Sequence, residues 1–156
     1  MKITAYVLIG VAMVSLSLCP TAARSGARVF GSATLQIEVT GVRNGKGVVH
    51  VDLCREAEFL KDCPVQASAP ALAGKTIVTI SNVQPGTYAV QAFHDENHNG
   101  KVDRALFGIP KEGVGFSNDA PIRLGPPKWK DAQFQLGDDK VITFKLRYFI
   151  GGGAKN

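Results

Sequence analysis

The sequence predicts an all-β fold, a single antiparallel β-sandwich of six or seven short strands. Apolar and polar residues alternate along most of the chain, and Val, Ile and Thr are frequent in the alternating segments. Turn signals made of Gly, Pro and Asn recur roughly every eight to twelve residues, and no long helical periodicity interrupts them. This spacing is typical of an antiparallel sandwich.

The first two strands are predicted at residues 34–40 and 47–54. Leu35, Ile37 and Val39 alternate with polar residues in the first of these segments. The sequence Asn44-Gly45 between the two segments tolerates positive φ angles, so the pair is expected to form a hairpin.

The rest of the domain is predicted from the same signals. Residues 56–73 contain Pro64 and Pro70 and are expected to be a long connection with at most one helical turn. The Pro85-Gly86 sequence marks a turn between two longer strands. The further strands are expected at residues 75–83, 87–93, 114–116, 133–136 and 140–149, and residues 151–156 are expected to be a disordered tail.

Residues 1–23 are predicted to be a cleaved export signal. Lys2 precedes an apolar run of about 16 residues, and small residues follow up to Ala23, where cleavage is expected, with Ala27 as a second choice. The run is shorter than the roughly 20 residues that cross a bilayer. A lipoprotein acylated at Cys19 is an alternative. Residues 24–33 are then a lead-in to a sandwich domain at residues 34–150, and the protein is expected to be periplasmic or secreted.

Cys54 and Cys63 remain after removal of the signal and are predicted to form a disulfide bond, because exported proteins fold in an oxidising compartment. A closed loop of about ten residues would stabilise the fold by roughly 2.7 kcal/mol in the chain-entropy model. Two free thiols are the alternative.

The charge of the chain bears on its partners. The formal net charge is +5, and residues 120–156 contain seven Lys and Arg but only three Asp. One interpretation is attraction to an anionic envelope surface, and the other is an ordinary solvated face. Nucleic-acid binding is not predicted, because aromatic residues do not interleave the basic ones.

The sharpest site prediction is a calcium loop at residues 95–103. Oxygen-bearing side chains alternate in the order of an EF-hand loop, and Gly100 permits the sharp turn. The twelfth position of the motif is Leu106 instead of the usual glutamate, and Glu112 is the candidate substitute. A metal-free loop of Asx turns is the alternative. The predicted ligands are Asp95, Asn97, Asn99, Asp103 and Glu112, with the backbone carbonyl of Lys101.

No catalytic constellation stands out, and the chain is not expected to be an enzyme. Ser117 does not lie in a Gly-x-Ser-x-Gly turn. His50 and Asp52 share one strand face, which is more typical of a surface contact. The alternative is an envelope enzyme that uses Asp95, Glu112 and a histidine. His94 and His98 flank the acidic loop and, with Asp95, are candidate ligands for copper or zinc, although this spacing aligns two rings only on a helix and a loop is expected here. Trp129 is expected to cap an edge of the sandwich.

Three blocks of the sequence carry a resemblance: residues 37–53, residues 85–103 and residues 108–118. They resemble a bacterial family, domain of unknown function 2141. The resemblance implies an exported β-sandwich and no assigned activity. The turn at Pro85-Gly86-Thr87-Tyr88 also resembles immunoglobulin-like and transthyretin-like sandwich modules. The expected function is therefore a binding or structural module with a calcium loop, or else an accessory subunit of an envelope complex.

Overall fold

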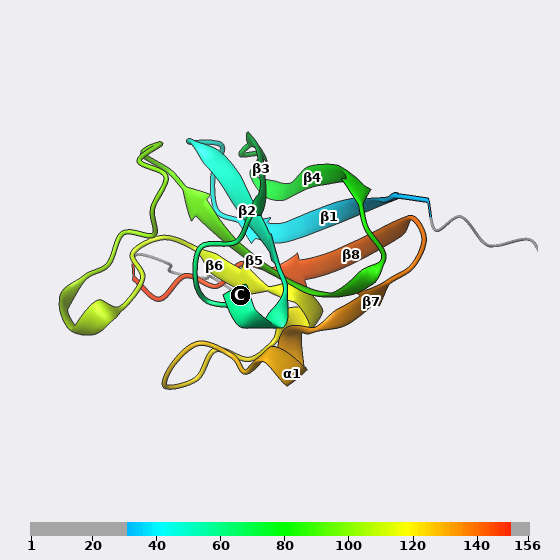
Figure 1. Cartoon of the computed structure of the whole chain (residues 1–156). Helices are drawn as coiled ribbons and strands as arrows, with labels where there is room; N and C mark the ends of the chain where they lie inside the picture. Colours follow the sequence, from blue (N-terminus) through cyan, green and yellow to red (C-terminus); the bar gives the residue numbers. More distant parts are fainter. Residues whose placement is uncertain (1–30, 151–156) are drawn as a thin grey trace, which may run out of the picture.

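Two β-sheets pack against each other in the computed structural model, which describes residues 31–150 (Figure 1). One sheet has the strand order β4-β1-β8, and the other has the order β3-β2-β5-β6, with β7 paired to β5. Eight strands are therefore present where six or seven were predicted. The strands are β1 (Ala33–Val42), β2 (Val48–Cys54), β3 (Val65–Pro70), β4 (Gly74–Val83), β5 (Gly86–Asp95), β6 (Val114–Phe116), β7 (Phe134–Leu136) and β8 (Lys140–Lys145).

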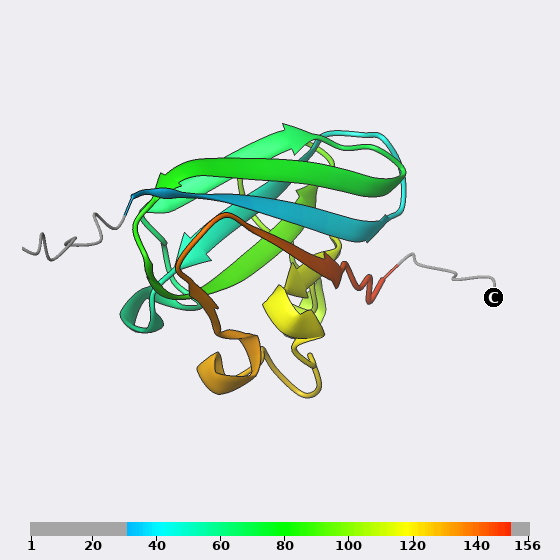
Figure 2. The same cartoon turned by 90° about the vertical axis from the view of Figure 1, so that its right-hand side faces the viewer.

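Short helical turns occupy the connections between the strands. Figure 2 shows them gathered mainly on one side of the two sheets. They are η1 (Glu56–Glu58), η2 (Leu106–Gly108), η3 (Ser117–Asp119) and α1 (Trp129–Ala132). Within residues 31–150, no helix is long and apolar enough to cross a membrane.

All strand pairs are antiparallel except β1 with β8, which run parallel with Ile37 opposite Ile142. The last strand ends at Lys145, earlier than the predicted residue 149. The chain then leaves the first sheet, and Arg147 exchanges two backbone hydrogen bonds of 2.8 and 3.0 Å with Val114 of β6. These bonds join the two sheets along one edge of the sandwich.

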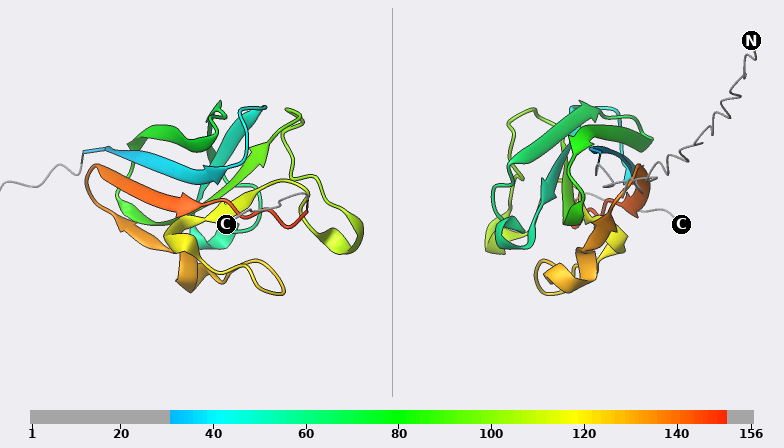
Figure 3. Two further views of the ribbon diagram at one scale, coloured as in Figure 1. Left: turned by 180° about the vertical axis from the view of Figure 1, so that it is seen from behind. Right: turned by 45° about the vertical axis from the view of Figure 1, so that its right-hand side comes forward.

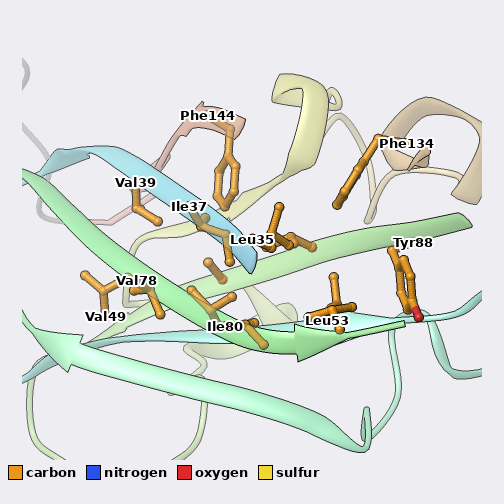
Figure 4. Close-up of a cluster of buried hydrophobic side chains, with 14 of the residues drawn as sticks. Leu35, Ile37, Val39, Val49, Leu53, Val78, Ile80, Tyr88, Phe134 and Phe144 are labelled. Carbon is orange, nitrogen blue, oxygen red and sulfur yellow. The ribbon is translucent and has the colours of Figure 1, made fainter. Parts of the chain in front are cut away.

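The core lies between the sheets and consists of the apolar faces of the alternating strands (Figure 4). Leu35, Ile37 and Val39 of β1 are fully buried, as the alternation predicts. Full burial of one such side chain contributes about 1.5–3 kcal/mol. Facing residues from both sheets and from β7 complete the core, among them Val49, Leu53, Val78, Ile80, Tyr88, Phe134 and Phe144.

Strand β3 lies within the segment that was predicted to be a connection. It forms the edge of its sheet and pairs only with β2. An edge strand tolerates proline at its end, as Pro70 illustrates, because its outer N–H groups need no partner. Val65 is partly exposed, so this strand lacks the clear apolar alternation that predicts a half-buried strand from the sequence.

A second apolar cluster surrounds a disulfide bond between Cys54 and Cys63. Both cysteines are buried, and Phe59 packs edge to face on Trp129 at 5.6 Å between ring centroids. The indole therefore caps this edge of the sandwich, as predicted. The predicted signal peptide, most of the lead-in and the predicted tail lie outside the described residues.

Candidate functional site

The acidic loop (residues 95–103) leaves the sheet at the end of β5. Asp95 is the last residue of that strand and is buried. Its Oδ1 accepts the backbone N–H of Asn99 at 3.1 Å, and its Oδ2 accepts that of Gly100 at 2.8 Å. Gly100 has φ +71°, a conformation that favours glycine. The Asp95 carboxylate therefore holds the chain in the tight turn that the motif requires.

The two asparagine side chains of the loop bridge its backbone to Asp103. Asn97 and Asn99 donate to the two carboxylate oxygens of Asp103 at 2.8 and 2.9 Å. Their own carbonyl oxygens accept the backbone N–H groups of Asn99 and Lys101. The oxygen side chains at alternate positions thus curl toward one side of the loop. Lys101 itself is exposed.

Glu112 lies in the next segment of the chain and contacts the acidic loop. It is buried, and its two oxygens accept the backbone N–H groups of Glu96 and Asp103, each at 3.1 Å. Burial raises the pKa of Glu112; the two N–H donors act against this effect, and the nearby charges of Asp95 and Asp103 add to it. The structure therefore brings the substitute ligand proposed from the sequence into contact with the loop.

The donor chemistry of the loop suits a hard cation, although its oxygens are not gathered around one point. Asp95, Asp103 and Glu112 all receive neutral N–H donors, and none of them pairs with a Lys or Arg side chain in residues 31–150. A carboxylate offers about four acceptor positions, so each retains capacity for a cation. No three His, Cys, Asp or Glu side chains in the described part of the chain are grouped closely enough to hold one metal ion.

The two histidines that flank the loop do not come together. His98 is exposed, with φ +60°. His94 is fully buried, and its ring nitrogens are already engaged by the Tyr148 hydroxyl at 2.8 Å and the Lys46 carbonyl oxygen at 2.7 Å.

The Glu96 carboxylate beside this pair binds the Arg43 guanidinium. Burial acts to raise the pKa of Glu96, but the hydrogen bonds from Arg43 and Asn44 outweigh it and hold the pKa below its ordinary value.

A second polar group lies on the outer face of β2. The Nε2 atom of His50 is 3.0 Å from Asp52 Oδ1, and the Gln91 amide donates to Asp52 Oδ2 at 2.9 Å. The hydrogen bond with Asp52 raises the pKa of His50, burial opposes this effect, and the Asp52 and Asp95 charges add to it. His50 also packs on the Phe93 ring at 5.0 Å.

Asp52 and Gln91 line one end of a groove of about 430 Å³ that the sequence did not reveal. The remaining walls are mostly apolar. Two loops, residues 102–110 and residues 122–126, supply much of them, and the rest comes from strands β5 and β6, Leu60 and Phe149. Leu106 and Phe107, together with Leu124, are exposed apolar residues in otherwise polar or glycine-rich stretches. The contrast between these apolar residues and their polar surroundings was the signal in the sequence that could have indicated the groove. Asp95, Glu112 and the histidines are not among the residues that line this groove.

Ser117 has a structural position. It is fully buried, its hydroxyl accepts the Val90 backbone N–H at 2.9 Å, and it donates to the Ala132 carbonyl oxygen. The side chain therefore fastens η3 to β5 and to the end of α1.

A model of a bacterial family, described as "uncharacterized protein conserved in bacteria" and designated domain of unknown function 2141, matches residues 37–143. The chain belongs to this family. The matched range of domain of unknown function 2141 begins inside β1 and ends inside β8, so it includes the acidic loop and Glu112. No curated protein and no solved structure matches the chain. The family therefore establishes the relationship of this β-sandwich without assigning an activity.

Proposed function

We propose that this protein is an exported binding module whose acidic loop, together with Glu112, binds one calcium ion. The observation that supports the proposal is that Glu112 bonds to the backbone at both ends of the loop that carries Asp95 and Asp103, through the N–H groups of Glu96 and Asp103. Two of these carboxylates are buried, and no basic side chain of the described residues neutralises them. Buried carboxylates without a counter-charge are costly, and a divalent cation would offset that cost.

Calcium fits the donor set better than a transition metal. Every candidate ligand is an oxygen atom, which calcium prefers, and its coordination is flexible enough for a mixture of carboxylate, amide and backbone oxygens. Binding would replace the hydrogen bonds from Asn97 and Asn99 to Asp103 and turn the two amide oxygens toward the ion. Glu112, whose oxygens already bond to the loop backbone, would have the role of the last glutamate in an EF-hand loop.

The expected affinity is modest, because the alternating positions include only two carboxylates. A dissociation constant of roughly 0.1–1 mM is typical of extracellular calcium modules. With a dissociation constant near 0.1 mM, calcium at about 1 mM would stabilise the fold by roughly 1.4 kcal/mol. The ion would then fix the geometry of the long segment between β5 and β6.

Calorimetric titration and thermal unfolding test the calcium proposal. The protein is first treated with a chelator and then measured with added calcium. We expect saturable binding heat and a melting temperature higher by about 5 °C. Glu112→Gln and Asp103→Asn should each weaken binding, whereas Asp138→Asn, an exposed carboxylate in the turn before β8, should leave it unchanged. The absence of both binding heat and a melting shift in the wild type would overturn the proposal.

The proposed export rests on the N-terminal pattern of the sequence and is supported by the disulfide bond between Cys54 and Cys63. Mass spectrometry of the protein from its host should show the loss of residues 1–23. An intact Met1 would contradict export, and a diacylglyceryl group on Cys19 would identify a lipoprotein instead.

A further inference from the structure

Two loops project from the same side of the molecule and face each other across the groove (Figure 1). The Phe107 loop (residues 103–111) connects the acidic loop to Glu112, and the Leu124 loop (residues 120–128) connects η3 to α1. Figure 3 shows the two loops beside each other again when the molecule is seen from behind. Their tips are apolar: the relative exposure is 98% for Phe107 and 108% for Leu124, and Leu106 is also exposed.

The Phe107 loop is a small, well-bonded hairpin. The Lys111 N–H donates to the Asp103 carbonyl oxygen at 2.8 Å, the Ala105 N–H donates to the Ile109 carbonyl oxygen at 2.8 Å, and the Arg104 side chain donates to the Gly108 carbonyl oxygen at 2.9 Å. This stem presents Phe107 at a defined position.

The structure shows no contribution of the Phe107 side chain to the stability of the fold. Its side chain is almost completely in water, and its φ of +63° is a left-handed conformation that is unfavourable for a bulky residue. The backbone strain opposes folding, and the exposed ring gains no burial that would offset it. An exposed and strained aromatic residue at the tip of an ordered loop indicates a role in binding.

The charges around the tips define the partner. Arg104 and Lys111 bracket the apolar residues of the first loop, and Arg123 and Lys128 bracket Leu124 in the second; all four basic residues are exposed. The nearest carboxylates lie at the bases of the loops: Asp103 accepts hydrogen bonds from Asn97 and Asn99, and Asp119 accepts the Lys145 N–H. The sequence has no acidic residue from 104 to 111 or from 120 to 130. The carboxylate that lines the groove, Asp52, is already bonded to His50 and Gln91.

From this arrangement we propose that the Phe107 and Leu124 loops form a surface that binds an anionic phospholipid bilayer. Leu106, Phe107 and Leu124 enter the boundary between headgroups and acyl chains, and Arg104 and Arg123 pair with headgroup phosphates. Apolar tips surrounded by cations are the combination that binds membrane interfaces. The residues differ from the proposed calcium ligands, so this proposal does not depend on calcium binding.

Single tryptophans placed at the tips test insertion directly. Phe107→Trp, Leu124→Trp and the control Val141→Trp, an exposed position on β8, are mixed with phosphatidylcholine and phosphatidylglycerol vesicles whose acyl chains carry bromine. The signal of the native Trp129 is subtracted by measuring the wild type. Because all variants have the same N-terminal segment, any contribution of that segment is common to them. We expect the added fluorescence to be quenched at positions 107 and 124 but not at 141.

Two further sets of variants separate apolar insertion from charge. Phe107→Asn combined with Leu124→Asn should weaken vesicle binding at least about tenfold without lowering the melting temperature, and Val141→Asn should not weaken it. Arg123→Gln and Lys128→Gln, which leave the stem of the Phe107 loop intact, should each weaken binding to anionic vesicles about fivefold.

The measurements are made in chelator and in calcium. Quenching specific to positions 107 and 124 in either condition supports the proposal. Equal quenching at all three positions, or none in both conditions, overturns it; the exposed loops would then be candidates for a protein partner.

Discussion

The side chains of His94 and Tyr148 meet edge to face inside the domain, with the Nδ1 atom of His94 2.8 Å from the Tyr148 hydroxyl. The other ring nitrogen lies 2.7 Å from the Lys46 carbonyl oxygen, which can only accept a hydrogen bond. In the neutral ring, Nε2 therefore carries the proton and Nδ1 accepts from the hydroxyl. The hydroxyl in turn accepts the Arg43 backbone N–H at 3.1 Å. The pair thus connects the loop between β1 and β2, the end of β5 and the chain after β8. The hairpin expected from the sequence at that loop does not form, because β1 and β2 belong to different sheets.

Replacing Tyr148 with phenylalanine should destabilise the fold, because the Nδ1 atom of the buried His94 then loses its donor. The expected decrease in the free energy of unfolding is about 1–3 kcal/mol, measured by urea denaturation. A double-mutant cycle with His94→Leu isolates the shared interaction, and its coupling energy should be about 0.5–3 kcal/mol. A coupling energy of zero would show that the two side chains contribute independently.

Gly47 should be far less tolerant of alanine than Gly108, although both have a left-handed backbone with φ near +70°. A Cβ atom on Gly47 would lie 1.8 Å from the Asp95 carbonyl oxygen, whereas nothing lies within 4 Å of one on Gly108. Gly108→Ala should therefore cost only the conformational strain of about 1–2 kcal/mol. Gly47→Ala should cost on the order of 4 kcal/mol, since backbone must move. Equal melting temperatures for the two variants would contradict the close approach.

The alternation of apolar and polar residues predicted the inner strands well because one face of each is buried. Strand β1 shows this clearly, with Leu35, Ile37 and Val39 all facing the core. Strand β3 could not be predicted in the same way, because it lies at an edge and Val65 is partly exposed. The early end of β8 at Lys145 follows from the backbone pairing of Arg147 with Val114, which joins segments distant in the sequence.

The site was predictable where its residues are consecutive and unpredictable where it depends on long-range packing. The positions of Asp95 and Asp103 follow from the spacing of the loop motif, and Glu112 was reached by its nearness in sequence. The engagement of His94 by Tyr148 and the groove between the Phe107 and Leu124 loops join distant segments. Alternation shows which face of a strand is buried, but it does not show which loops meet.

Replacing both Cys54 and Cys63 with alanine should lower the free energy of unfolding by about 2.7 kcal/mol, the entropy of closing a loop of about ten residues in the unfolded chain. Denaturation of the wild type with and without a reductant checks this value, and the double variant should not respond to the reductant. Under denaturing, non-reducing conditions these residues of the wild type should show no reaction with a thiol reagent. Two reactive thiols in that assay would contradict the bond.

The His50–Asp52 contact should make the stability of the fold depend on pH near neutrality. The hydrogen bond with Asp52 raises the pKa of His50 above its ordinary value of 6.5 despite partial burial, so the folded state holds the proton more tightly than the unfolded state. The resulting stabilisation is fully present below pH 6.5, and it is lost as the pH rises through the higher pKa of the folded protein.

The measurement is the free energy of unfolding of the wild type and of His50→Gln between about pH 5.5 and 8.5, a range that contains the histidine titration. The wild type should lose stability relative to His50→Gln as the pH increases, because titrations shared by the two proteins cancel in the difference. Asp52→Asn, which removes the charged partner but retains an amide oxygen, should flatten this dependence. A difference that remained constant or increased with pH would show that the pKa of His50 is not raised in the folded protein.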